Sequence, residues 1–219
     1  MAIKALLFDF DGTIADSSVG IIASLKYALE INGVGASISQ EKIRNAIGPP
    51  LVPLIKRVLD DKADEKMTKA IAVSYREHYS VKGLFMAELY EDVEKTLNSL
   101  STKYLLYVVS SKPKEFLEKL MLKLGIIKYF NGVYGPGLGL TPLKKADLVK
   151  ICLEESNLKA GECIMIGDKA EDVEAAKTNG VKTAGVLYGF GTAKELETAG
   201  AACLIEKPYD LIKTDYNSI

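Results

Sequence analysis

The chain has 219 residues, 48% of them hydrophobic, which suffices for one large domain or a domain with a sizeable insertion. Its 28 Lys and Arg residues nearly balance 29 Asp and Glu residues, and the net charge of -1 argues against binding nucleic acid or an acidic membrane through bulk charge. The three cysteines lack metal-ligand spacing, and the N-terminal apolar run is broken at Asp9. We therefore expect reduced thiols, no signal peptide and a cytoplasmic protein.

The first expected strand is the apolar run at residues 5–8, which reads as a strand buried on both faces in a parallel sheet. Alternation along this strand is expected to place the following Asp9 and Asp11 on the same side. Two carboxylates so near each other can both stay ionised only beside a cation or several hydrogen-bond donors. A calcium loop is excluded, because its sixth and twelfth positions require Gly and Glu and are here Ile14 and Gly20.

The next region, residues 17–82, has helical periodicity and no convincing strand. Four helices are expected, the first capped by Ser17 or Ser18 and stopped at Asn32-Gly33, the second capped by Ser39, and the others at 51–59 and 64–79. This region has the length of a small helical bundle.

From residue 90 onward, helices and apolar strands alternate. Strands are expected at 104–109, near 133, and at 163–166, 182–186 and 202–205, with helices between them at 91–100, 113–124, 143–156, 171–179 and 193–199. This alternation predicts an α/β fold, a Rossmann-like parallel sheet with helices on both faces. Because the first strand belongs to the same sheet, the expected core comprises residues 1–15 and 83–219, and residues 16–82 form an inserted helical domain.

Polar groups follow two further strands, and ligands of open parallel sheets bind at such strand ends. Ser110 and Ser111 precede Pro113, which suits the first position of a helix. The free N–H groups of a helix N-terminus, together with a hydroxyl group, make a seat for phosphate, although either serine could simply cap the helix.

Another strand ends in Gly167-Asp168, with Asp172 one helical turn further on, and Lys144-Lys145 opens a different helix. Asp168 can reach the same cation as Asp9, and a lysine ammonium suits phosphate oxygens. Taken singly, these groups also fit a helix cap and a solvated surface. Together they suit Mg²⁺, which prefers oxygen ligands and usually retains waters and substrate phosphate.

Over nearly its whole length, the chain resembles the haloacid dehalogenase superfamily of phosphohydrolases, and within it the phosphoglycolate phosphatase-like group. The motifs that carry this resemblance are Asp9-Phe-Asp11-Gly12-Thr13, Val109-Ser110-Ser111-Lys112-Pro113, Thr141-Pro-Leu-Lys144-Lys145-Ala and Gly167-Asp168-Lys-Ala-Glu-Asp172. The helical insert matches the helical form of the family's cap domain.

The resemblance implies a magnesium-dependent phosphatase that acts through an aspartyl-phosphate. Asp9 would be the nucleophile, and Asp11 would protonate the leaving alcohol and then activate water. Asp9, the backbone carbonyl of Asp11, and Asp168 would hold Mg²⁺, and Asp172 would bind the metal through water or orient the lysine. The phosphate-binding residues would be Thr13, Ser110, Ser111 and Lys145, or Lys144 in its place.

The expected substrate is a small phosphorylated metabolite, such as phosphoglycolate, a sugar phosphate or a nucleotide, and the expected assembly is a monomer or homodimer. Arg44, Gly48 and Pro49 are the candidates for a specificity loop in the cap, whereas His78 is expected to be packed or to cap a helix. The alternatives are a phosphomutase of the β-phosphoglucomutase type, a 5'-nucleotidase or pyrophosphatase, and a phosphoaccepting signalling domain. Signalling domains of that kind lack a helical insert after the first strand.

Overall fold

The computed structural model describes residues 2–34, 38–60, 62–139 and 143–219, so Thr141 of the lysine motif lies outside the described residues. The chain divides into two compact units, one formed by Met1–Asp16 and Leu89–Ile219 and the other by Ser17–Glu88. The sequence placed the insert at residues 16–82. Its function as a cap over the site stays a prediction.

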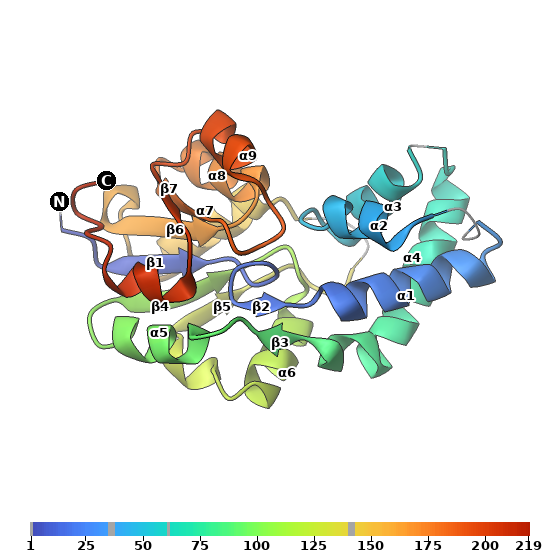
Figure 1. The fold of residues 1–219 in the computed structure, drawn as a ribbon, viewed down its shortest axis with the longest axis horizontal. Helices are drawn as coiled ribbons and strands as arrows, with labels where there is room; N and C mark the ends of the chain where they lie inside the picture. The colour runs from blue at the N-terminus through green and yellow to red at the C-terminus, as the bar shows by residue number, and fades with distance from the viewer. Residues whose placement is uncertain (1, 35–37, 61, 140–142) are drawn as a thin grey trace. The chain divides into compact units, whose positions relative to one another are not determined.

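The first unit is built on a six-stranded parallel sheet, which confirms the predicted α/β fold (Figure 1). In the order in which they pair, the strands are β5 (Gly132–Tyr134), β4 (Leu105–Val109), β1 (Ala5–Phe8), β6 (Cys163–Gly167), β7 (Lys182–Val186) and β8 (Cys203–Ile205). Two further strands, β2 (Ala15–Asp16) and β3 (Glu88–Leu89), pair in a separate sheet and were not predicted, because two residues are too few to show a period.

Helices cover both faces of the large sheet. They are α5 (Val93–Leu100), α6 (Lys114–Lys123), α7 (Lys145–Glu155), α8 (Ala170–Thr178) and α9 (Ala193–Ala199), with short 3-10 turns at Ile127–Tyr129, Ala160–Glu162 and Pro208–Ile212. Figure 1 shows α8 and α9 on the opposite side of the sheet from α5 and α6. Alternate residues of β1, Ala5 and Leu7, pack in one buried cluster with Val149 of α7 and Ala176 of α8. The β1 residues are fully buried, as the continuous apolar run predicted.

The second unit contains α1 (Ser18–Ile31), α2 (Gln40–Ala46), α3 (Leu51–Val58), α4 (Glu65–Val81) and a 3-10 turn at Gly83–Met86. Ser39 caps α2 by accepting a hydrogen bond from the N–H of Lys42, as predicted. Ser17 occupies the N-cap position of α1, which confirms one of the two predicted cap residues, but its side chain makes no capping hydrogen bond. His78 is packed within this unit, with its ring stacked on Tyr27 and its Nδ1 3.0 Å from Ser24 Oγ.

The position of β1 determines where a ligand site can form. It lies between β4 and β6, with Phe8 in register with Val108 and Ile166. The chain adds β4 and β5 on one side of β1 and then β6, β7 and β8 on the other, which is the strand reversal where open α/β sheets bind ligands. The three cysteines are free, and within the described residues no helix is long and apolar enough to span a membrane.

Candidate active site

A tight turn follows β1 and carries the first motif. The carbonyl of Phe10 accepts hydrogen bonds from the N–H groups of Ile14, at 2.9 Å, and Ala15, at 3.1 Å. Gly12 has φ +89, and a Cβ there would overlap the Asp168 carboxylate. Both the backbone conformation and the space therefore require glycine. This close approach brings the turn against the end of β6.

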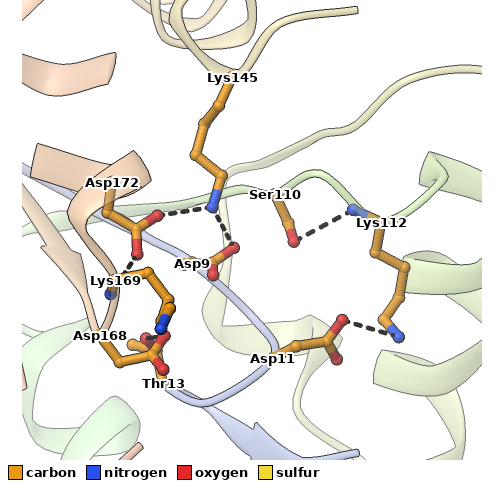
Figure 2. A network of polar contacts seen from close by, with 9 residues as sticks. All are labelled: Asp9, Asp11, Thr13, Ser110, Lys112, Lys145, Asp168, Lys169 and Asp172. Atoms are coloured by element: carbon orange, nitrogen blue, oxygen red, sulfur yellow. Dashed lines mark hydrogen bonds and ion pairs between the residues drawn. The ribbon is translucent and has the colours of Figure 1, made fainter. Parts of the chain in front are cut away.

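Asp9 faces the first turn of α7. Its Oδ1 lies 3.0 Å from Lys145 Nζ, and the same ammonium group lies 2.5 Å from Asp172 Oδ1. Figure 2 shows the Lys145 ammonium group between these two carboxylates. Lys145 is buried, whereas Lys144 is exposed. Of the two lysines that the sequence left open, only Lys145 has its ammonium group at Asp9.

Asp168 is fully buried and is held from two directions. Thr13 donates its hydroxyl hydrogen to Asp168 Oδ1 at 3.3 Å, and the Phe190 N–H donates to Oδ2 at 2.7 Å. One oxygen from each of Asp9, Asp168 and Asp172 lies within 4.8 Å of the others. Residues 9 and 168 are therefore close enough to share an ion.

The charges of this cluster are mutually dependent. Burial would lower the pKa of Lys145, but the Asp172 and Asp9 carboxylates outweigh burial and raise that pKa above its usual value. Burial raises the pKa of Asp172 to about 6, despite the opposing effect of Lys145. Burial, followed by the charges of Asp172 and Asp9, raises the pKa of Asp168. One ammonium group cannot neutralise three ionised carboxylates, so full ionisation would leave an excess of negative charge, and the raised pKa values of Asp168 and Asp172 reflect this cost.

The donor set fits a metal ion that prefers oxygen ligands. Asp9 Oδ1 is buried and accepts no hydrogen bond from the described residues, and its contact with Lys145 is an ion pair without hydrogen-bond geometry. A buried carboxylate oxygen of this kind is costly unless a cation compensates it. The cluster of Asp9, Asp168 and Asp172 can therefore hold a metal ion.

Asp11 has a lysine partner of its own. Its Oδ2 lies 3.0 Å from Lys112 Nζ, and Figure 2 shows it directed towards Lys112. The sequence placed Asp9 and Asp11 on one side by the alternation of a strand, but β1 ends at Phe8 and Asp11 lies in the turn that follows, so strand alternation does not determine where Asp11 points. The two carboxylates have separate cationic partners instead of sharing one.

Ser110 follows β4, next to β1 in the sheet, and is buried. Its N–H donates to the Tyr134 carbonyl at 3.0 Å, and its Oγ accepts a hydrogen bond from the N–H of Lys112 at 3.4 Å. The helix here begins at Lys114, and Pro113 is its N-cap residue rather than its first helical residue. Both Ser110 and Ser111 therefore precede the start of the helix.

Comparison with known proteins identifies the family. Residues 6–186 match the model of the haloacid dehalogenase-like hydrolases, which is most of the chain. The chain belongs to this family. A 5'-nucleotidase from Pseudomonas aeruginosa is 33% identical, with 87% of this chain and 86% of that protein covered. A phosphoglycolate phosphatase from Colwellia psychrerythraea is 27% identical over 90% of each chain. The crystal structure of a predicted phosphatase from Clostridium acetobutylicum has a TM-score of 0.90 and 32% identity, and covers 97% of this chain and 98% of its own.

Family membership, the fold and the resemblance stated from the motifs agree. The chain is a hydrolase of the phosphatase type. The alternative that it is a phosphoaccepting signalling domain is therefore excluded. The individual roles of Asp9, Asp11, Asp168 and the phosphate-binding residues stay predictions. The Thr13 hydroxyl group donates a hydrogen bond to Asp168, one of the three clustered carboxylates. The motif had suggested that Thr13 binds phosphate.

Several residues at the site were missed. Phe190 contributes a backbone N–H to Asp168, and Glu195 of α9 accepts a hydrogen bond from the Ala170 N–H and forms an ion pair with Lys169, both at 3.0 Å. These contacts hold the first turn of α8, which carries Asp172. A backbone N–H donor, or a carboxylate far away in the sequence, has no motif by which it could be recognised from the sequence. The one signal in the sequence was the pair of glycines on either side of Phe190.

The candidate specificity residues lie in the helical unit. Arg44 is on α2 and donates to Ser18 Oγ at 2.6 Å, and Gly48 and Pro49 follow α2 and are half-buried. The contact between Arg44 and Ser18 connects two helices of the same unit. A role for Arg44, Gly48 and Pro49 in substrate choice stays a prediction.

Proposed function

We propose that the protein is a magnesium-dependent phosphatase that hydrolyses a small phosphomonoester through an aspartyl-phosphate on Asp9. The observation that carries this proposal is the buried cluster of Asp9, Asp168 and Asp172 around Lys145. Bound Mg²⁺ would be held by Asp9, Asp168 and the backbone carbonyl of Asp11, and would supply charge neutralisation for the phosphoryl group.

The first step transfers the phosphoryl group to the protein. A carboxylate oxygen of Asp9 forms a bond to phosphorus, and the bond from phosphorus to the substrate oxygen breaks. The leaving oxygen keeps the electron pair and takes a proton from the Asp11 carboxyl group, so an alcohol departs. Lys145 and Ser110 would bind phosphoryl oxygens, where fixed positive charge and hydrogen bonds stabilise the transition state.

The second step releases phosphate. Water attacks the phosphorus of the aspartyl-phosphate, the ionised Asp11 accepts the proton that the water loses, and the bond to the Asp9 oxygen breaks. Asp9 and protonated Asp11 are thereby regenerated. The net reaction consumes one phosphomonoester and one water and gives an alcohol and inorganic phosphate.

The substrates to test first are nucleoside 5'-monophosphates and phosphoglycolate, because relatives carry the names 5'-nucleotidase and phosphoglycolate phosphatase. We also propose that residues of the helical unit, Arg44 foremost, determine which of them is preferred. Three free cysteines support a reducing compartment such as the cytoplasm.

The test measures phosphate release from nucleoside monophosphates, phosphoglycolate, sugar phosphates and pyrophosphate, with Mg²⁺ and with EDTA. We expect turnover only with Mg²⁺, and at least a 10³-fold loss in Asp9→Asn, which replaces the nucleophilic oxygen. Unchanged phosphate release by Asp9→Asn would refute the covalent mechanism. Conversion of a sugar phosphate to its isomer without phosphate release would identify a phosphomutase instead.

A further inference from the structure

A second charged pair, Lys112 with Asp11, lies beside the Asp9 cluster (Figure 2). Asp11 has a role in the proposed reaction, whereas Lys112 has none. Lys112 Nζ is 3.0 Å from Asp11 Oδ2, and the Lys112 side chain is only 4% exposed. A lysine is seldom buried to this degree unless its charge is paired. In Figure 2 this pair is separate from the contacts among Asp9, Lys145 and Asp172. The Lys112 ammonium group is therefore in direct contact with Asp11.

The backbone around Lys112 is fixed on both sides. Before it, the Ser110 N–H donates to the Tyr134 carbonyl at 3.0 Å, and after it, the Lys114 N–H donates to the Pro136 carbonyl at 2.9 Å. The Lys112 N–H itself is 3.4 Å from Ser110 Oγ. The ammonium group thus projects from a segment held to the end of β5 and to the chain just after it. Its position is set by the core of the first unit, as a positioning group requires.

We propose that Lys112 is a positioning residue for the acid–base group Asp11. This inference rests on the proposed function, in which Asp11 gives a proton to the leaving oxygen and later takes one from water. Asp11 lies in a turn, outside any strand, so its carboxyl group needs a side-chain contact to restrain it. A general acid works only within hydrogen-bond reach of the oxygen it protonates. The Lys112 ammonium group can restrain Asp11 in both of its states, by a hydrogen bond to the neutral carboxyl group and by an ion pair with the carboxylate.

The experiment separates this role from direct binding of phosphate by Lys112. It compares kcat/KM for a nucleoside 5'-monophosphate, whose alkoxide leaving group needs a proton, with kcat/KM for p-nitrophenyl phosphate, whose leaving group does not. Because kcat/KM reports only the steps up to the departure of the first product, the later use of Asp11 as a base does not enter.

We expect Lys112→Met to lower kcat/KM about 30-fold or more for the nucleotide and less than about 3-fold for p-nitrophenyl phosphate. Lys112→Arg, which keeps the charge, should recover most of the nucleotide activity. Lys114→Met is the matched control, because Lys114 is 54% exposed and has Glu118 as its ion-pair partner. It should leave both values unchanged. Lys112→Gln provides a second neutral variant should Lys112→Met fail to fold, as judged by circular dichroism.

Asp11→Asn calibrates the comparison, since it should discriminate between the two substrates in the same direction. The double variant Asp11→Asn with Lys112→Met should lose no more nucleotide activity than Asp11→Asn alone. Equal losses on both substrates with a raised KM, or additive losses in the double variant, would overturn the inference and make Lys112 a phosphate ligand. A wild-type protein without metal-dependent turnover of any phosphomonoester would instead overturn the proposed function.

Discussion

The Lys145 ammonium group is in direct contact with two of the three clustered carboxylates, and its removal tests the charge balance of the site. We expect Lys145→Met to lower kcat about 10²- to 10³-fold, the usual cost of losing one preorganised charge at a transition state. It should also destabilise the metal-free protein by about 3 kcal/mol, because it leaves buried carboxylates uncompensated. Phosphate release and urea unfolding measure the two effects.

The neighbouring Lys144 provides the control for this prediction. It is exposed at the N-cap of α7, and Lys144→Met should change kcat less than twofold. Comparable losses in both variants would contradict the assignment of the site lysine. The sequence could predict that a lysine belongs here, yet it could not choose between adjacent residues, because that choice depends on the rotation of α7 against the sheet. The motif resemblance favoured Lys145, and Lys145 is the buried one of the two lysines.

At the scale of elements, the segment after β7 supports the Asp168 carboxylate, a candidate metal ligand, through the backbone N–H of Phe190. A Cβ at Gly191 would overlap the backbone oxygen of Asp168, so Gly191→Ala must displace the segment that carries the Phe190 N–H. We expect affinity for Mg²⁺ to fall about 10-fold, as when other partners that support metal ligands are lost. The concentration of Mg²⁺ that gives half-maximal phosphate release measures this change.

Gly137→Ala is the matched substitution for this test, because no atom lies within 4 Å of a Cβ built there. It should leave the dependence on Mg²⁺ unaltered. If Gly191→Ala behaved in the same way, the backbone donor of Phe190 would not matter for the site.

The elements themselves were largely predictable, because β1, β4 and β6 are continuous apolar runs and their ends must meet at one edge of the sheet. That reasoning brought Asp9 and Asp168 together correctly, and Ser110 follows the strand that pairs with β1. It could not place Asp11, which lies in a turn, or Glu195, whose contact depends on how α9 packs on α8. Turn conformation and helix packing are properties of the folded chain and have no short sequence period.

At the scale of the whole molecule, the buried cluster of Asp9, Asp168 and Asp172 links stability to pH. The pKa of Asp172 is raised to about 6 and that of Asp168 is also raised, against about 3.9 for an aspartate in an unfolded chain. A raised carboxyl pKa means that the folded protein binds the proton more tightly. The contribution of Asp172 to the stability of the metal-free protein is complete below about pH 4 and is lost as the pH rises through about 6, and the raised pKa of Asp168 acts in the same direction.

Above that pH the Asp172 carboxylate is ionised, so a divalent cation should stabilise the fold most where protons stabilise it least. We expect Mg²⁺ at 100 times its Kd at pH 7.5 to raise Tm by about 5–11 °C at that pH, from about 2.7 kcal/mol of binding linkage. The same concentration should raise Tm much less at pH 5, where protons compete for the carboxylates. Thermal unfolding at matched ionic strength measures both shifts. Asp168→Asn should abolish the shift at pH 7.5, because it removes one of the three carboxylates that would surround the ion. An equal shift at both pH values would mean that Mg²⁺ stabilises the protein somewhere other than at Asp9, Asp168 and Asp172.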